Sequence, residues 1–329
     1  MPSEIAKTPQ VRFLDNPKCA LRIPRLDDIW EYLSDLSTMG QFASMGQGLS
    51  FRPDGKIPDG ATKYSDQCFS GAVRGFRSLG RKTMIHELPR EEWVSVSGEC
   101  VEALRRGGAV DTPQVLLSAY RVSRAQWRVK ALMDRDGHAV TNNFLVCRPK
   151  TELPLEMFWA IWNSPIGNAF IWCRTDKRHN LAGTLARLPF PHLHRGDVER
   201  VVAAVRAYTG VFPVVEPGHL GALPEPDTVR RALLEVDAEV LRLYDLPPRK
   251  ERRLLDLFNG AARPGVPCSF GDYFDSGFRP CVPLHEYLSD DYRQMTVGTL
   301  RQRLSDSSDP GVVRALAAAE EAFTMGGED

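Results

Sequence analysis

The sequence predicts an α/β fold of the α+β kind, in which a mixed, mostly antiparallel sheet domain precedes long helices and a helical C-terminal tail. Short apolar runs separated by turns fill residues 64–150, which is typical of a sheet built from short strands. Amphipathic helical patterns follow from residue 193 onward. At 329 residues the chain is long enough for two domains, or for one domain with extensions.

The change in composition after residue 192 predicts three parts. Residues 1–192 are expected to form the α/β domain, and residues 193–258 are expected to form a helical spacer. Residues 259–329 are expected to combine an irregular, Pro-rich segment with a helical, acidic tail.

Periodicity and turn residues predict the individual elements. We expect helices over residues 26–36, 99–106, 155–162, 166–172, 197–208, 227–244 and 251–258, with two more in the tail. We expect strands over residues 11–14, 93–96, 115–118, 127–132, 139–140 and 144–147, a hairpin turn at 134–137 and a glycine turn at 47–51. The large aromatic residues of the helices at 155–172 share a face with aliphatic ones, which predicts core packing rather than a platform for stacking nucleic-acid bases: Phe158, Trp159, Trp162 and Phe170.

The overall composition is that of a globular protein that works in the cytoplasm. The hydrophobic fraction of 43% and the charged fraction of 26% are ordinary for such proteins. No apolar run approaches the ~20 residues that a membrane span needs, and residues 1–7 lack the apolar core of a signal peptide. None of the seven cysteines forms a Cys-x-x-Cys pair, so we expect neither a zinc ribbon nor a redox motif, and no metal or cofactor.

The charge distribution is uneven although the net charge is zero. A neutral total argues against a protein that coats nucleic acid indiscriminately. Two stretches nevertheless carry cations and no acid, residues 67–85 and residues 120–130, while the tail is acidic. Such a pattern predicts a positively charged face on the sheet domain.

The motifs of common enzymes are missing from the sequence. It contains no Gly-x-Ser-x-Gly elbow, no His-Glu-x-x-His helix and no glycine-rich loop that would hold a methyl donor. His192 and His194 lie in a Pro-flanked loop without a third metal ligand nearby. We therefore expect a protein that binds and does not catalyse, although a cryptic nuclease stays open as an alternative.

One family has a similar order of features over about residues 36–258, most specifically between residues 112 and 191. A basic strand and turn at 127–137 precede the apolar strand at 143–150, the aromatic segment Trp162-Asn163-Ser164-Pro165-Ile166-Gly167-Asn168 and the closing Leu188-Pro189-Phe190-Pro191. This order resembles the target-recognition domains of adenine DNA methyltransferases and of type I restriction–modification specificity subunits. The resemblance implies that the Asn-Ser-Pro helix is scaffold and that the long helix at 227–244 docks a partner. Specificity subunits hold two such modules and this chain shows one, so it acts either alone in trans or as half of a homodimer.

The resemblance and the charge pattern together predict which residues contact DNA. Phosphate contacts are expected from cations of the two acid-free stretches and of a later basic cluster: Arg74, Arg77, Arg81, Lys82, Arg124, Arg128, Lys177 and Arg178. Base contacts are expected from polar residues in turns and loops: Gln47, Ser123, Gln126, Asn142 and Asn143. We also expect Arg124 and Arg128 to be removable together without loss of stability.

The sequence therefore predicts a non-catalytic subunit that recognises a sequence in double-stranded DNA. It would serve a restriction–modification or phage-defence system with a separate methyltransferase, nuclease or translocase. The alternative is a protein-interaction scaffold, in which the helices of 227–258 and the acidic tail hold an enzyme and the sheet domain does not read DNA.

Overall fold

The computed structural model describes residues 26–80, 82–175, 178–212, 224–294 and five positions of the tail, namely 310, 311, 313, 314 and 317. Contacts divide the chain into two compact units, Met1–Pro283 and Leu284–Asp329. The division at residues 192 and 258 stays a prediction from the sequence pattern. The strand predicted at 11–14 lies outside the described residues, as do most of the predicted tail helices.

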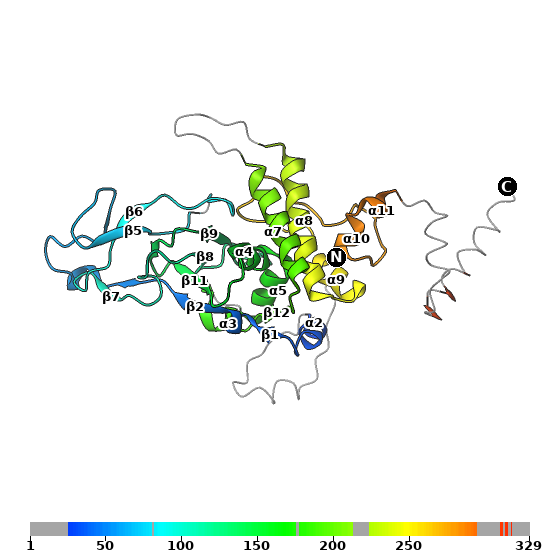
Figure 1. Cartoon of the computed structure of the whole chain (residues 1–329), viewed down its shortest axis with the longest axis horizontal. Helices are drawn as coiled ribbons and strands as arrows, with labels where there is room; N and C mark the ends of the chain where they lie inside the picture. Colours follow the sequence, from blue (N-terminus) through cyan, green and yellow to red (C-terminus); the bar gives the residue numbers. More distant parts are fainter. Residues whose placement is uncertain are drawn as a thin grey trace. The chain divides into compact units, whose positions relative to one another are not determined.

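The β part of the first unit consists, within the described ranges, of two four-stranded sheets and two smaller pairings (Figure 1). Its strands are β1 (Ser37–Thr38), β2 (Ala43–Gln47), β3 (Ser50–Phe51), β4 (Tyr64–Ser65), β5 (Ala72–Phe76), β6 (Glu92–Ser95), β7 (Val101–Ala103), β8 (Gln114–Ser118), β9 (Ala131–Asp134), β10 (Ala139–Val140), β11 (Phe144–Pro149) and β12 (Pro189–Phe190). One sheet has the order β2-β11-β8-β9 and is antiparallel throughout. The other has the order β10-β5-β6-β4 and is parallel at β10–β5 alone.

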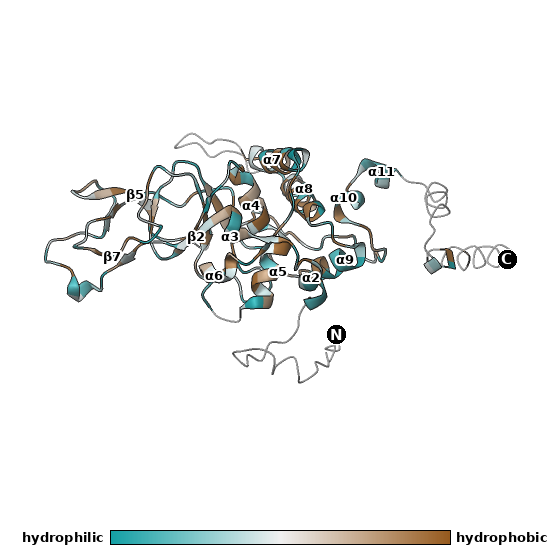
Figure 2. Ribbon diagram, turned by 60° about the horizontal axis from the view of Figure 1, so that its bottom comes forward, coloured by the Kyte–Doolittle hydropathy of each residue, from teal (hydrophilic) through white to brown (hydrophobic). Residues whose placement is uncertain are grey.

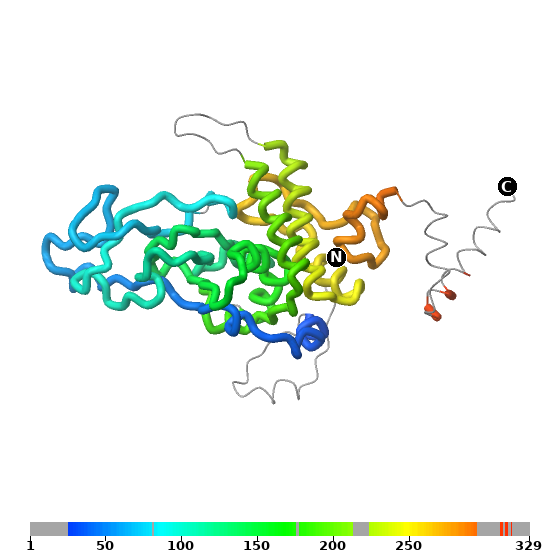
Figure 3. The backbone as a smooth tube through the Cα atoms, in the orientation of Figure 1, coloured from blue at the N-terminus to red at the C-terminus, as the bar shows by residue number. Residues whose placement is uncertain are grey.

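The helices of the first unit are α2 (Asp27–Tyr32), α3 (Met39–Phe42), the 3-10 helix η1 (Asp54–Lys56), α4 (Leu155–Asn163), α5 (Pro165–Arg174), α6 (Ala182–Leu185), α7 (Arg195–Gly210), α8 (Pro226–Tyr244) and α9 (Pro248–Asp256). Helices α3, α4 and α6 pack on the sheet of order β2-β11-β8-β9. The second unit contributes α10 (Leu284–Tyr287) and α11 (Asp290–Arg293). Helix α4 packs on β8 and β9, and α7 and α8 run side by side against α4 (Figure 3). The α+β fold class is thereby confirmed. No helix in the described part of the chain is long and apolar enough to cross a bilayer.

The break between α4 and α5 follows from three consecutive residues. Asn163 ends α4, and Ser164 then leaves the helical conformation with a ψ of 165°. The Ser164 hydroxyl accepts a hydrogen bond from the Gly167 amide and so caps α5. Pro165 takes the first position of α5, where a missing N–H costs nothing. The Asn-Ser-Pro sequence therefore encodes a corner between two helices, as its pattern predicts.

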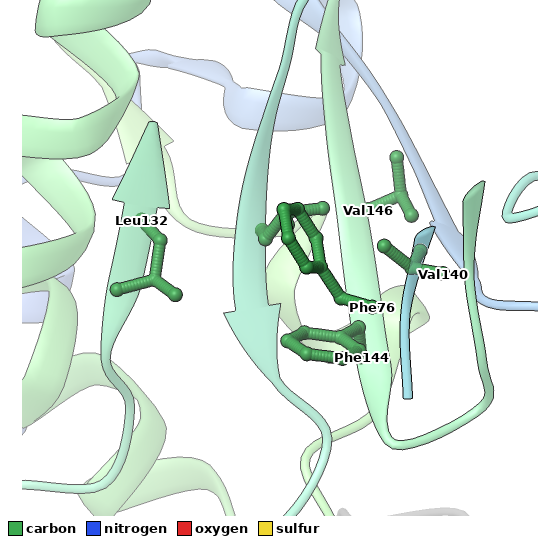
Figure 4. Packing of buried hydrophobic residues seen from close by; sticks show 6 residues of the cluster. Phe76, Leu132, Val140, Phe144 and Val146 are labelled. Carbon is green, nitrogen blue, oxygen red and sulfur yellow. The ribbon is translucent and has the colours of Figure 1, made fainter. Parts of the chain in front are cut away.

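The hydrophobic core lies between the sheets and α4. A cluster from both sheets contains fully buried Phe76, Leu116, Leu132, Val140, Phe144 and Val146 (Figure 4). Helix α4 is buried along its whole length, and in Figure 2 it is coloured as largely hydrophobic, whereas α9 is coloured as largely hydrophilic. The predicted aromatic residues Phe158, Trp159 and Trp162 are 0% exposed. Their prediction as core is confirmed, and none of the three is available to stack on a base.

Three elements predicted from local patterns are wrong. Residues 99–106 form no helix, because Val101–Ala103 form strand β7 and pair with β3. The turn at 134–137 closes no hairpin, because β9 pairs with β8 while β10 pairs in parallel with β5. The strand expected over 127–132 begins only at Ala131. In each case, contacts between residues far apart in the chain override the local pattern.

A buried ion pair joins α8 to the segment after α9. The Arg263 guanidinium donates to both oxygens of Asp237 at 2.5 and 3.1 Å, and the Tyr273 hydroxyl donates to the same carboxylate at 2.9 Å. Arg263 also donates to the carbonyl of Asn163 at 2.6 Å, so that the pair anchors the end of α4. Burial opposes the charge on Arg263, but the neighbouring Asp237 carboxylate raises the pKa of Arg263 above its ordinary value.

Substitution Asp237→Ala is expected to lower the free energy of unfolding by about 3–5 kcal/mol, because it leaves the Arg263 charge buried and uncompensated. Urea denaturation followed by circular dichroism measures the free energy of unfolding of the variant and of the wild type. The matched control is Glu199→Ala, which removes the exposed ion pair with Arg195 and should cost less than about 1 kcal/mol. Equal losses in the two variants would contradict the role assigned to the buried pair.

Candidate nucleic-acid interface

A pocket of about 800 Å³ with several cations in its lining opens where five segments of the first unit meet. We call it the cationic pocket. It is lined by residues from the loop after β5, the loop between β8 and β9, the turn before β11, the segment after α5 and the segment after α9: Ser78, Leu79, Gly80, Ser118, Tyr120, Arg121, Val122, Ser123, Arg124, Lys130, Asn143, Arg178 and Pro264.

The loop between β8 and β9, residues 119–130, supplies more of this lining than any other segment and is held by asparagine side chains from the helices. The Asn168 side-chain oxygen accepts from the amides of Arg128 and Val129 at 2.7 and 2.9 Å. At the end of the loop, Asn163 accepts from the Ala131 amide and donates to the Ala131 carbonyl, both at 3.0 Å. The side chains of Asn163 and Asn168 thus bond to backbone groups that a neighbouring strand would pair in a sheet. This is why residues 127–130 are not a strand.

The segment after α5 forms further hydrogen bonds to the same loop. The side-chain amide of Asn180 donates a hydrogen bond to the Ser118 carbonyl at 2.9 Å. Its backbone amide donates one to the Ala119 carbonyl at 2.8 Å. The Arg121 amide donates to the Arg178 carbonyl at 2.9 Å. These bonds bring Arg178 beside the loop although the two are distant in sequence. The Arg178 guanidinium lies over the Tyr120 ring, 5.4 Å from its centroid.

The described lining of the pocket is rich in positively charged side chains. Four cations line it, Arg121, Arg124, Lys130 and Arg178, and no aspartate or glutamate is among the described lining residues. Within the part of the chain that the structure describes, no carboxylate pairs with the three arginines. A cluster of like charges without counter-ions raises the local potential and attracts anions.

Lys130 is the most unusual of the four cations. Only 2% of it is exposed, and its ammonium donates to the carbonyls of Thr83 at 2.7 Å and Gly80 at 3.3 Å. Burial lowers the pKa of Lys130 to about 8, against the smaller opposing effect of the Glu87 carboxylate. Through these two hydrogen bonds, Lys130 links the segment after β5 to the loop 119–130.

The structure brings four of the residues predicted to contact DNA together in the pocket, namely Ser123, Arg124, Asn143 and Arg178. Three more are exposed on neighbouring positions: Arg77 and Lys82 flank the lining residues 78–80, and Asn142 precedes Asn143. The Asn143 side chain donates to the Arg77 carbonyl at 3.0 Å, which joins two of these segments. The predicted residues Arg81 and Lys177 lie outside the described residues.

The remaining predicted residues stand apart from the pocket. Arg74 pairs with Glu91 at 2.5 Å, so its charge is already partly neutralised. Gln47, on β2, accepts a hydrogen bond from Arg105. Gln126 is half-buried in the loop without lining the pocket.

Arg128 is not at the surface, which corrects the expectation that it contacts phosphate. Only 3% of it is exposed, its guanidinium lies 4.5 Å from the Trp172 ring centroid, and it donates to the Thr175 carbonyl at 3.3 Å. Because Asn168 holds the backbone of Arg128 and Val129, this side chain is directed into the protein. These contacts argue against the expectation that Arg128 can be removed without loss of stability.

Sequence reasoning missed several lining residues. Arg121 and Lys130 belong to the basic stretch 120–130, so charge alone could have added them. Tyr120 opens that stretch and is 38% exposed. Pro264 is brought to the pocket by the fold, and the sequence carries no signal for it. Within the described ranges, no three His, Cys, Asp or Glu side chains gather in a way that could hold a metal ion.

Comparison with known proteins gives distant likenesses. No protein-family model matches the chain, and no curated protein matches it significantly. A structure of the type IIL restriction–modification enzyme MmeI in complex with DNA is similar over 45% of this chain and 21% of that chain, with 18% identity and a TM-score of 0.31. The HsdS subunit from Thermoanaerobacter tengcongensis is similar over 67% of this chain and 49% of its own, with 13% identity and a TM-score of 0.35. This chain spans less than half the length of either.

Substitution Arg128→Ala is expected to lower the free energy of unfolding by about 1–3 kcal/mol, because it removes packing on Trp172 and a hydrogen bond to Thr175. Arg124→Ala, which alters an exposed residue of the same loop, should stay within about 0.5 kcal/mol of the wild type. Thermal and urea unfolding measure both. If Arg128→Ala is as stable as Arg124→Ala, the buried placement of Arg128 is incorrect.

The stability contributed by Lys130 should depend on pH. Its pKa of about 8 in the folded chain lies below the ordinary 10.5, so the unfolded chain binds more protons between these values. The free energy of unfolding of the wild type, relative to Lys130→Met, should therefore rise as the pH rises from 8 to 10. Urea titrations at several pH values measure this difference. A difference that is constant over the window, or that falls, would contradict the lowered pKa.

Proposed function

We propose that the chain is a DNA-recognition subunit of a restriction–modification or phage-defence system, and that the cationic pocket lies at the centre of its DNA-binding face. The observation that supports this is that Arg121 and Arg124 of the loop 119–130 and Arg178 of the segment after α5 line one pocket, and no ion pair of these three arginines is found in the described part of the chain. DNA carries a dense line of phosphates, and lysine and arginine side chains that meet them supply most of the affinity.

Sequence reading is assigned to the polar residues of the same face. Ser123 and Asn143 line the pocket, and exposed Asn142 lies beside them. Amide groups can pair with two positions on a base edge, while a serine hydroxyl can both donate and accept. The arginine fork matches both phosphate and the guanine edge, so Arg124 and Arg178 are suited to either contact. Exposed Arg77 and Lys82 extend the positive face beyond the pocket.

We assign no catalytic step to the chain itself. A separate methyltransferase, nuclease or translocase would supply it, and the helices α7 to α9 within residues 193–258 are the proposed docking region. This arrangement is what the resemblance to target-recognition domains implies. Whether a second copy supplies a second recognition module is decided by measuring the mass of the protein in solution with and without DNA.

Substitution of Arg124 and Arg178 together by Ala is expected to weaken binding to duplex DNA by at least about tenfold near physiological salt, since two phosphate contacts are lost. The slope of log affinity against log salt should become shallower by about 2, one for each contact. Fluorescence anisotropy with a labelled random-sequence duplex measures both quantities.

The matched control is Arg195→Ala combined with Arg253→Ala. These substitutions remove two exposed arginines from α7 and α9, and neither residue lines the pocket. The control should bind DNA with nearly wild-type affinity and slope. If the two double variants behave alike, the pocket is not the DNA-binding site. If the wild-type protein binds no duplex at all but retains a protein partner, the scaffold alternative replaces the proposal.

A further inference from the structure

The shape of the cationic pocket goes beyond what contact with a duplex backbone requires. Phosphates of an intact duplex are met by side chains on a surface, and its stacked bases cannot enter a hollow. The pocket measures about 800 Å³, which lies within the range of about 300–1,000 Å³ that holds small ligands. A hollow of this size with several cations in its lining points to a ligand that enters it.

The lining combines two kinds of chemistry. The guanidinium groups of Arg121, Arg124 and Arg178 are suited to a phosphate. An aromatic ring, Tyr120, and three aliphatic side chains, those of Leu79, Val122 and Pro264, form an apolar part of the same lining. Apolar side chains add nothing to the binding of an inorganic anion, whereas they can pack against the flat faces of a nucleobase.

Tyr120 is held in place as a binding ring would need to be. Its backbone forms a bridge with His179, and its ring lies 4.5 Å from the His179 ring and 5.4 Å from the Arg178 guanidinium. It nevertheless remains 38% exposed, and among the phenylalanine, tryptophan and tyrosine side chains that the structure describes only Tyr32 is more exposed. The hydroxyl and amide groups of Ser123 and Asn143 stand in the same lining and are suited to the polar edge of a base.

We propose that the cationic pocket binds a single unstacked nucleotide, with its phosphate on the arginines and its base against Tyr120 and the aliphatic wall. The nucleotide would be one that leaves the stack of the bound DNA, and in that form the inference rests on the proposed function. A free nucleoside monophosphate carries the same chemistry, so the experiment has one arm for each source. No bond is made or broken in this step.

The first arm compares a fully paired duplex with the same duplex carrying a one-nucleotide bulge, using 2-aminopurine as the bulged base. An unpaired base avoids the cost of leaving the stack, so the bulged duplex should bind at least about tenfold more tightly. Its 2-aminopurine emission should change on binding. The second arm titrates an equimolar mixture of the four deoxynucleoside monophosphates by calorimetry, with inorganic phosphate as the reference.

The test variant is Val122→Trp, which fills the pocket without changing its charge. It should abolish the preference for the bulge and the binding of monophosphates. The matched control is Val110→Trp, which introduces the same side chain at another half-buried valine outside the lining. Thermal melting confirms that both variants fold. If Val122→Trp does not fold, Tyr120→Ala replaces it, and the same losses are expected.

The outcomes separate this inference from the proposed function. Equal affinity for bulged and paired duplexes, together with no monophosphate binding, overturns the inference, while loss of duplex binding in the Arg124 and Arg178 variant still supports the function. If no duplex binds but monophosphates bind and Val122→Trp prevents it, the function fails and the nucleotide pocket stands. Binding of inorganic phosphate as tight as that of the monophosphates overturns the nucleotide assignment.

Discussion

The architecture around the cationic pocket depends on hydrogen bonds between asparagine side chains and the backbone of the loop 119–130. Asn163 and Asn168 come from adjoining helices, and Asn180 comes from the segment that follows them. Each satisfies amides or carbonyls that a strand would otherwise pair. A buried backbone group without a partner costs about 1–3 kcal/mol, so the loop and the helix corner stabilise each other. The corner in turn is fixed by Ser164 and Pro165.

Arginine serves three different purposes in the first unit, and the surroundings decide which. Arg263 is buried opposite Asp237, where it joins α4 to α8. Arg128 is buried over Trp172 and supports the loop from inside. Arg124 and Arg178 line the pocket without a carboxylate among their described neighbours, so their charge remains available to a ligand. Counting arginines in a stretch of sequence therefore overestimates the number that a ligand can reach.

Much of the fold could be predicted from the sequence, because its signals are local. The helix α8 shows its apolar spacing in the sequence, and Val229, Leu233 and Val240 are buried as that spacing requires. The corner at Asn163 to Pro165 is equally local. Strand β7, by contrast, exists because of pairing with β3, and no pattern of neighbouring residues reports such a contact.

The candidate site was predictable in part for the same reason. The acid-free stretch 120–130 reveals that a positive loop exists, and Arg124 follows from it. The direction of the Arg128 side chain cannot be predicted from this stretch, because Asn168, which lies on a helix, holds the backbone of Arg128. Pro264 reaches the pocket through the fold, alongside the contact between the Ile85 amide and the Gly265 carbonyl at 2.9 Å.

The way in which the loop is anchored also bears on how this protein can diverge. Asparagine side chains from other segments form hydrogen bonds to the backbone of this loop. Their partners are backbone amides and carbonyls, which do not depend on the side chains of the loop. Exchange of side chains such as those of Arg121 and Arg124 leaves those anchors untouched. Side chains of this loop that line the pocket can therefore be exchanged without loss of the hydrogen bonds from Asn163, Asn168 and Asn180 to its backbone.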